Sequence, residues 1–103
     1  MLNTLTRQQV TDILRQQLPY LSAEYGVTRL GIFGSYAKGV QQEQSDIDLV
    51  AEFKTPLGLR FVELTDYLEQ LFHAPVDVLT PAGIQAIRNA KVAKDIQESI
   101  VYV

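Results

Sequence analysis

The sequence predicts an α/β (α+β) domain in which a small mixed β-sheet is flanked by helices. Two kinds of pattern support this fold class. Apolar residues recur at helical spacing in several segments, and short apolar or β-branched runs bounded by glycine and proline indicate three strands. The length of 103 residues is near the common size of one domain, so we expect residues 1–103 to form a single domain with one core.

The composition is that of an ordinary globular protein, with 47% hydrophobic and 20% charged residues. The formal net charge of −3 disfavours unaided binding to nucleic acid, which generally needs a basic surface. The absence of cysteine excludes disulfides and thiolate metal ligands. The sequence shows neither a signal peptide nor a membrane span. We therefore expect a cytoplasmic protein that contacts neither nucleic acid nor a membrane directly.

The first predicted helix covers residues 6–18, whose apolar positions fall on one face. Thr4 or Thr6 can cap its N-terminus. Pro19 is expected to kink or end this helix, and residues 20–25 are expected to form one more helical turn before Gly26 stops it. We interpret the segment as support for the sheet.

The next run, residues 29–33, is short, mostly apolar and bounded by glycine, as is typical of a buried strand. It ends at Gly34 and Ser35. Glycine lets a bulky ligand approach the main chain closely. If residues 36–38 form a helical turn, Ser35 lies at its N-terminus, where unpaired N–H groups favour an anion such as phosphate. Gly34 and Ser35 are therefore a candidate phosphate-binding site.

A second apolar run begins with Asp46 and Asp48 on either side of Ile47. Residues two apart in a strand point to the same face, so both carboxylates are expected to project together. Such close like charges repel unless a cation lies between them or one is protonated. Oxygen ligands without histidine or cysteine favour Mg²⁺, often held together with substrate phosphates. The connection of residues 36–45 is too short for a crossover helix, so we expect the two strands to be antiparallel.

Either half of this pattern has an ordinary interpretation. Gly-Ser is common in turns, and Ser-Asp-Ile-Asp can be a solvated strand entry. Together, four fixed residue types at this spacing are expected by chance about once in several hundred chains of this length. The combination therefore favours a functional site.

After a loop, apolar residues at helical spacing over residues 61–72 predict an amphipathic helix that covers one face of the sheet. His73 is expected to end that helix rather than to catalyse. Residues 76–79 predict a third strand, in which Asp77 lies between two valines. A carboxylate there is costly to bury unless it faces a metal or solvent. Asp77 either joins the other two carboxylates or faces water from an edge strand.

Thr80 and Pro81 suit the start of another helix, as cap and first-turn residue. An apolar pattern at helical spacing continues after Pro81, and we expect an interruption near Asn89. Residues 100–103 are apolar enough to be a docked tail or part of a partner interface, and the sequence alone does not distinguish these.

Gly34-Ser35, ten intervening residues and Asp46-Ile47-Asp48 match the signature of the DNA polymerase β-like nucleotidyltransferase superfamily. With the surrounding words GIFGSYAKG and SDIDLVAEF, the chain resembles the minimal nucleotidyltransferase group, which includes antitoxins paired with HEPN-domain toxins. The resemblance implies a polymerase β-like nucleotidyltransferase fold.

The resemblance also implies a reaction, the Mg²⁺-dependent transfer of AMP from ATP. It assigns the ATP phosphates to Gly34 and Ser35, assisted by Lys38, and one or two Mg²⁺ ions to Asp46 and Asp48. Asp77 stands at the family's third carboxylate position.

The acceptor that the resemblance implies is the hydroxyl of a tyrosine on a HEPN toxin in a hetero-oligomer. One alternative is a non-catalytic antitoxin that neutralises its partner by binding, which the intact motif disfavours. Another is an enzyme that modifies a small molecule such as an antibiotic, which the lack of room for a substrate domain disfavours.

Overall fold

The computed structural model describes residues 5–39 and 46–103. The expected cap at Thr4 and the second half of the connection between the first two strands, residues 40–45, lie outside the described residues. The elements follow one another as α1 Arg7–Tyr25, β1 Val27–Phe33, α2 Gly34–Lys38, β2 Ile47–Phe53, α3 Arg60–Phe72, β3 Val76–Leu79, α4 Pro81–Gln85, α5 Ala90–Ser99 and β4 Val101–Tyr102.

The strands form one mixed sheet in the order β3-β2-β1-β4. β1 and β2 are antiparallel, as the short connection between them predicts, whereas β2 and β3 are parallel and are joined through α3. These pairings confirm the predicted mixed sheet with flanking helices. The sheet has one strand more than predicted, because β4 pairs with β1 at Gly31 and Ile32.

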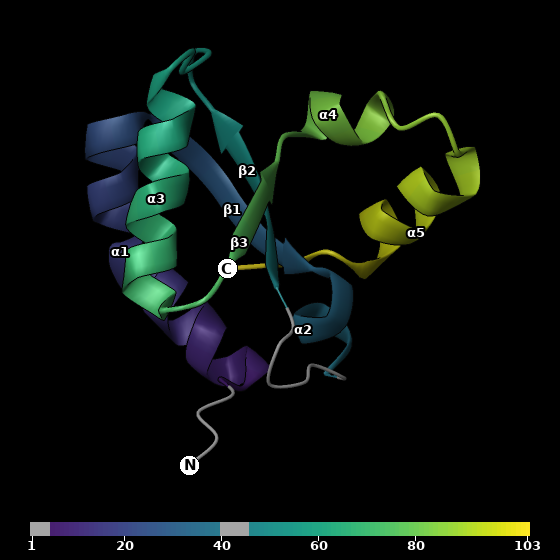
Figure 1. Cartoon of the computed structure of the whole chain (residues 1–103), viewed down its shortest axis with the longest axis horizontal. Helices are drawn as coiled ribbons and strands as arrows, with labels where there is room; N and C mark the ends of the chain where they lie inside the picture. Colours follow the sequence, from purple (N-terminus) through teal and green to yellow (C-terminus); the bar gives the residue numbers. More distant parts are fainter. Residues whose placement is uncertain (1–4, 40–45) are drawn as a thin grey trace.

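One face of the sheet carries the larger hydrophobic core. α1 and α3 lie side by side on this face (Figure 1). Alternate residues of β1 and β2 point toward them, as the two-residue period of a strand requires. The fully buried side chains of this core include Val10, Leu14, Leu21, Leu30, Ile32, Ile47, Leu49, Leu64 and Leu68.

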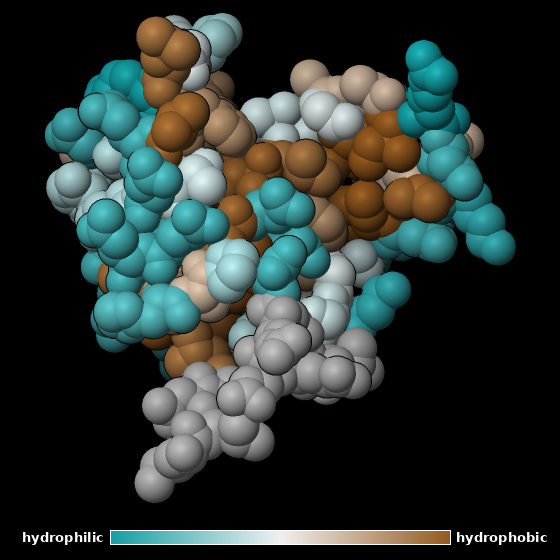
Figure 2. Space-filling view, viewed as in Figure 1, coloured by the Kyte–Doolittle hydropathy of each residue, from teal (hydrophilic) through white to brown (hydrophobic). Residues whose placement is uncertain are grey.

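The opposite face carries a smaller core, made by Phe33, Val50 and Ile84 with partly buried residues around them. α4 and α5 lie on this side (Figure 1). Figure 2 shows hydrophobic residues gathered between the sheet and these two helices, while the visible surface of α3 is largely hydrophilic. α5 contains no buried residue, so its apolar side is only partly covered.

α1 continues through Pro19 to Tyr25, so the helical turn expected before Gly26 is confirmed, whereas an end of the helix at the proline is wrong. Proline removes one backbone donor and leaves the carbonyl four residues earlier without its usual partner. Both Pro19 and Arg15 are exposed, so that carbonyl is on the solvent side of the helix and the loss is tolerated. The predicted ends are confirmed: Thr6 caps the helix, and Gly26 ends it with φ of +71°.

The later boundaries also follow the sequence. His73 ends α3 in the left-handed conformation, Thr80 caps α4, and Asn89 separates α4 from α5 as the cap of α5. The C-terminal residues are a docked tail, since Val101 and Tyr102 pair with β1 at the sheet edge. Among the residues that the structure describes, no helix is long and apolar enough to cross a membrane.

Candidate active site

Asp48 and Asp77 are direct neighbours in the sheet. The parallel pairing of β2 and β3 places the two residues opposite each other, between the pairs Ile47 with Val76 and Leu49 with Val78. Residues that face each other in adjacent strands project from the same side of the sheet. Asp48 shares its side with Val50, two residues on, which belongs to the core under α4 and α5. The carboxylate pair therefore lies on the α4–α5 face.

Asp46 is less constrained than the sequence suggested. β2 begins at Ile47, so Asp46 lies one residue before the strand, and it is exposed. The strand period that was expected to align Asp46 with Asp48 therefore applies only to Asp48. Asp46 remains close enough to act electrostatically on Asp48, as the pKa of Asp48 indicates.

The pKa of Asp48 is raised to about 6. Burial is the largest cause, because the charged carboxylate loses hydration, and the negative charges of Asp77 and then Asp46 add to the effect. A cation bound among these groups would relieve all three contributions. The half-buried Asp48 is thus the side chain for which a bound metal changes the energy most.

Asp77 lies on β3, which is an edge strand of the sheet. Its side chain is exposed while Val76 and Val78 on the other face are buried. The expected cost of burying this carboxylate therefore does not arise. Asp77 lies beside Asp48 and is also exposed to water. The two alternatives raised by the sequence, a place among the carboxylates and a place on an edge strand facing water, therefore both apply.

Gly34 lies directly against Asp48. β1 ends at Phe33, which pairs with Asp48, and Gly34 follows with φ of +71°, a conformation that residues with a Cβ rarely adopt. A Cβ at this position would collide with Oδ2 of Asp48 and lie 3.2 Å from its Cγ. Glycine is therefore required at position 34 for two reasons: its positive φ, and the Asp48 carboxylate that occupies the place of a Cβ.

α2 continues from this contact. Ser35 is half-buried, and the next two residues, Tyr36 and Ala37, are buried and join the core beneath α1 and α3. Lys38 is exposed in the last turn, at the other end of α2 from Gly34. The structure thus brings Gly34 to Asp48 of the carboxylate pair, with Ser35 next to it in the chain, and leaves Lys38 at the far end of α2.

The donor set suits a hard cation. The candidate ligands are carboxylate oxygens, which is the chemistry that Mg²⁺ prefers, and Mg²⁺ is commonly completed by substrate phosphates and water. Within residues 5–39 and 46–103, no three histidine, cysteine, aspartate or glutamate side chains form a preassembled metal cluster. The predicted convergence of three carboxylates is therefore present only as the Asp48–Asp77 pair with Asp46 nearby, as mutual repulsion favours in the absence of a cation.

A hollow of about 430 Å³ lies at the other end of β2. It contains none of the predicted site residues, and its lining is Ala51, Glu52, Phe53, Thr55, Pro56, Thr80, Pro81 and Ala82. The candidate site is defined by the contact of Gly34 with the carboxylates and not by the volume of this hollow.

Arg7, which the sequence analysis did not single out, contacts α2 through its guanidinium. No spacing signal links residues 30 positions apart, so only the fold reveals it.

The mixed sheet, with a glycine-containing turn placed against paired carboxylates, is the arrangement of a nucleotidyltransferase. Comparison with known proteins agrees: the nucleotidyltransferase domain family matches residues 14–103. The chain belongs to this family and is an enzyme of the nucleotidyltransferase class.

Two curated relatives match almost the whole chain. MJ0128 of Methanocaldococcus jannaschii, whose name proposes a protein adenylyltransferase, is 42% identical over 99 residues, which are 95% of this chain and 98% of the relative. Protein adenylyltransferase MntA of Thermococcus cleftensis is 34% identical over 100 residues, covering 96% of this chain and 97% of the relative. The relatives and this chain therefore align over nearly their full lengths.

Two solved structures share the fold. One, described as a proposed minimal nucleotidyltransferase, superposes with a TM-score of 0.72 at 24% identity. The superposition covers 96% of this chain and 97% of the other chain. A chain from a toxin–antitoxin structure with AMP-PNP superposes with a TM-score of 0.63 at 20% identity, covering 95% and 72%. These likenesses confirm a minimal nucleotidyltransferase fold.

Proposed function

We propose that this protein transfers AMP from ATP to a side-chain hydroxyl of a partner toxin, with Mg²⁺ as cofactor, and that the transfer inactivates the partner. The observation that carries the proposal is the contact of Gly34 with Asp48, which sets the backbone of a glycine turn beside paired carboxylates. The partner is a HEPN-domain toxin, its acceptor is a tyrosine, and the two proteins form a hetero-oligomer in the cytoplasm.

The donor and the acceptor are supported by the relatives. Proteins 42% and 34% identical to this chain over nearly its full length carry names that describe AMP transfer to proteins. A structural neighbour with the same fold was crystallised as a toxin–antitoxin with an ATP analogue. Together these favour ATP over other nucleotides and a protein over a small molecule as acceptor.

The chain's own residues have separate tasks in this reaction. Because Gly34 has no side chain, its backbone lies directly against the Asp48 carboxylate, and in this proposal the backbone at Gly34 and Ser35 binds the triphosphate. Lys38 adds positive charge from the end of α2. Asp46, Asp48 and Asp77 are the residues that would hold Mg²⁺. When bound, Mg²⁺ neutralises the triphosphate and stabilises the charge that develops during in-line displacement.

The transfer itself balances without a further reactant. The acceptor oxygen forms a bond to the α-phosphorus of ATP, and the bond from that phosphorus to the oxygen bridging to the β-phosphate breaks. Pyrophosphate leaves with the bridging oxygen. Asp77, exposed on its edge strand, is placed to accept the proton of the acceptor hydroxyl. A phosphate-bearing group on a toxin's tyrosine then adds negative charge, which opposes the binding of an RNA substrate.

The test uses this protein, its HEPN-domain partner, Mg²⁺ and ATP labelled at either the α- or the γ-phosphate. We expect label on the partner from the α position only. A kinase would label it from the γ position, and neutralisation by binding alone would give no label. Asp46→Asn and Asp48→Asn should each lower transfer by about 100-fold or more, since each removes a charged ligand from the site.

The matched control is Asp66→Asn, which removes the same charge from the exposed side of α3 and should leave transfer unchanged. The extent to which the toxin is neutralised must match the extent to which the toxin is labelled. If Asp46→Asn neutralised the toxin as well as wild type at equal concentration, modification would not be the mechanism of inhibition.

A further inference from the structure

The start of α1 is tied to the end of α2 by one side chain. Nη1 of Arg7 donates a hydrogen bond of 3.0 Å to the backbone carbonyl of Ala37, across 30 residues of sequence. Figure 1 shows the beginning of α1 and α2 at the same end of the sheet. Arg7 is the first residue of α1, whereas Ala37 is in the last turn of α2.

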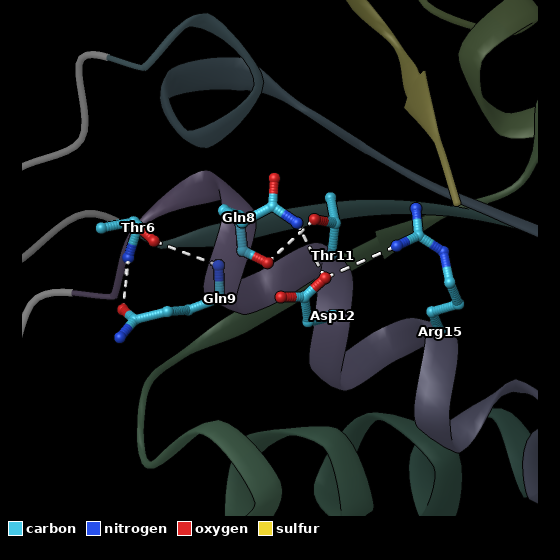
Figure 3. A network of polar contacts seen from close by, with 6 residues as sticks. All are labelled: Thr6, Gln8, Gln9, Thr11, Asp12 and Arg15. Atoms are coloured by element: carbon cyan, nitrogen blue, oxygen red, sulfur yellow. Dashed lines mark hydrogen bonds and ion pairs between the residues drawn. The ribbon is translucent and has the colours of Figure 1, made fainter.

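Arg7 is held by a well-capped helix end. The Thr6 hydroxyl accepts a hydrogen bond from the backbone N–H of Gln9 at 3.1 Å, and the Gln9 side chain accepts one from the N–H of Thr6 at 2.8 Å (Figure 3). This reciprocal pair fixes the first turn of a helix. Val10 and Leu14 then anchor α1 in the main core. Arg7 therefore extends from a rigid element.

α2, in contrast to α1, is too short to be stable without contacts to the rest of the protein. It has five residues, far fewer than a helix needs to be stable by itself, so tertiary contacts hold it in place. Carbonyls of the last turn have no donor within a helix. Gly39 donates to the carbonyls of Ser35 and Tyr36, and Arg7 donates to that of Ala37. A guanidinium at this end also suits the helix dipole.

We propose that Arg7 is a positioning residue for nucleotide binding, a role that rests on the proposed function. Arg7 fixes the C-terminal end of α2, and α2 carries Gly34 and Ser35 at its other end, against Asp48. Because α2 is short and is placed by contacts at its two ends, a shift of its C-terminal end changes where the backbone at Gly34 and Ser35 meets the triphosphate. Arg7 itself touches no reacting atom.

The role predicts a particular kinetic signature. Loss of the Arg7 bond leaves the carboxylates in place but lets α2 move, so ATP binds more weakly in the ground state and the transition state alike. Such a loss raises KM and leaves kcat nearly unchanged. For Arg7→Ala we expect a rise of about five- to tenfold in the KM for ATP, which is within the range for the loss of one ordinary hydrogen bond.

The experiment measures KM and kcat of transfer to the partner, and the affinity for a non-hydrolysable ATP analogue with Mg²⁺ by calorimetry. Arg7→Lys should recover part of the affinity, because an ammonium still donates to a carbonyl but without the reach of the guanidinium. Arg15→Ala is the matched control: this arginine lies on the same helix and pairs only at 3.5 Å with Asp12 on the surface. It should keep wild-type affinity.

Three results would overturn the inference: wild-type KM in Arg7→Ala, an equal loss in Arg15→Ala, or a loss that tracks a lowered melting temperature in both. Its failure is distinct from failure of the proposed function. If wild type labels the partner and Arg7→Ala has an unchanged KM, only the role of Arg7 is wrong. If wild type binds the analogue but labels nothing, the transfer is wrong, and calorimetry on Arg7→Ala still decides the role of Arg7. A wild type that does not bind the analogue overturns both.

Discussion

The two faces of the sheet are built differently. The α1–α3 face is closed by two long helices, and most of the fully buried side chains lie there. Among residues 5–39 and 46–103, the buried residues of the core on the α4–α5 face are Phe33, Val50 and Ile84. This face is covered by a five-residue helix and by a helix without any buried residue. All three carboxylates of the candidate site belong to or border this second face.

This difference separates stability from chemistry. A carboxylate pair under α1 and α3 would be deprived of water on all sides, at a large energetic cost. On the α4–α5 face, Asp48 is only half-buried and Asp77 is exposed, so both can be charged when a cation or substrate arrives. The α1–α3 face stabilises the sheet that holds these residues in register. Variants on the two faces should therefore have different consequences.

The largest expected effect on stability is on the closed face. Leu68→Ala removes a fully buried side chain from α3 and should lower the free energy of unfolding by about 2–5 kcal/mol. Ile96→Ala removes a side chain of equal size from α5, which is only partly buried, and should cost about 1 kcal/mol. Urea denaturation with an unchanged m-value measures both. Equal losses would mean that the two faces contribute alike.

The sequence predicted the closed face well, because that face depends on local patterns. Apolar residues at helical spacing identified α1 and α3, and capping residues such as Thr6 and Thr80 marked where helices begin. The sequence did not show whether Pro19 would end the helix, because the effect of a proline depends on whether the carbonyl it leaves unpaired can reach water. That condition is a property of the packed structure and not of the local sequence.

The other face was harder to predict, since it depends on contacts between distant segments. The sequence identified Gly34, Asp48 and Asp77 by residue type and by resemblance. It did not show that the Gly34 backbone touches the Asp48 carboxylate, or that Asp77 lies at an edge. The strand β4 was missed because two residues give no period. Its docking needs Gly31, where a Cβ would lie 2.8 Å from a methyl of Ile100.

Gly34→Ala tests whether the open face depends on that backbone contact. Gly39→Ala is an internal control, because Gly39 has φ of +73° but nothing within 4 Å of a Cβ, whereas Gly34 has φ of +71° and the Asp48 carboxylate there. Each variant should lose about 1–2 kcal/mol of stability from backbone strain. Only Gly34→Ala should also move Asp48 and lower the affinity for an ATP analogue, by at least about tenfold.

Lys38→Ala provides the comparison for charge. Its flexible, exposed ammonium is screened by salt, so we expect a smaller loss of affinity than for Gly34→Ala. Calorimetry at one ionic strength ranks the three variants. A Gly34→Ala protein that binds the analogue as tightly as Gly39→Ala would place the phosphate site elsewhere.

The smallest expected effect concerns the energetic cost of the carboxylate pair itself. The pKa of Asp48 is about 6 in the fold, against 3.8 for an unperturbed aspartate. Between these values the folded state binds more protons than the unfolded state, so the contribution of Asp48 to stability falls as the pH rises from about 4 to 6. Above pH 6 its charge destabilises the metal-free protein fully. Asp48→Asn removes that charge and should stabilise the protein by about 1 kcal/mol at pH 7, after allowance for screening by water.

Thermal melts of the metal-free protein in chelator at pH 4 and pH 7 measure this difference. Near pH 4 the aspartate is mostly protonated in the fold, so wild type and Asp48→Asn should melt at similar temperatures. At pH 7 the variant should melt higher, while Asp66→Asn on the outer side of α3 should show no such gain. Added Mg²⁺ should raise the melting temperature of wild type more than that of Asp48→Asn, because only wild type keeps the full carboxylate pair. A variant that is less stable than wild type at pH 7 would show that Asp48 supports the fold. The claim that the α1–α3 face provides stability while the α4–α5 face carries the site would then be wrong.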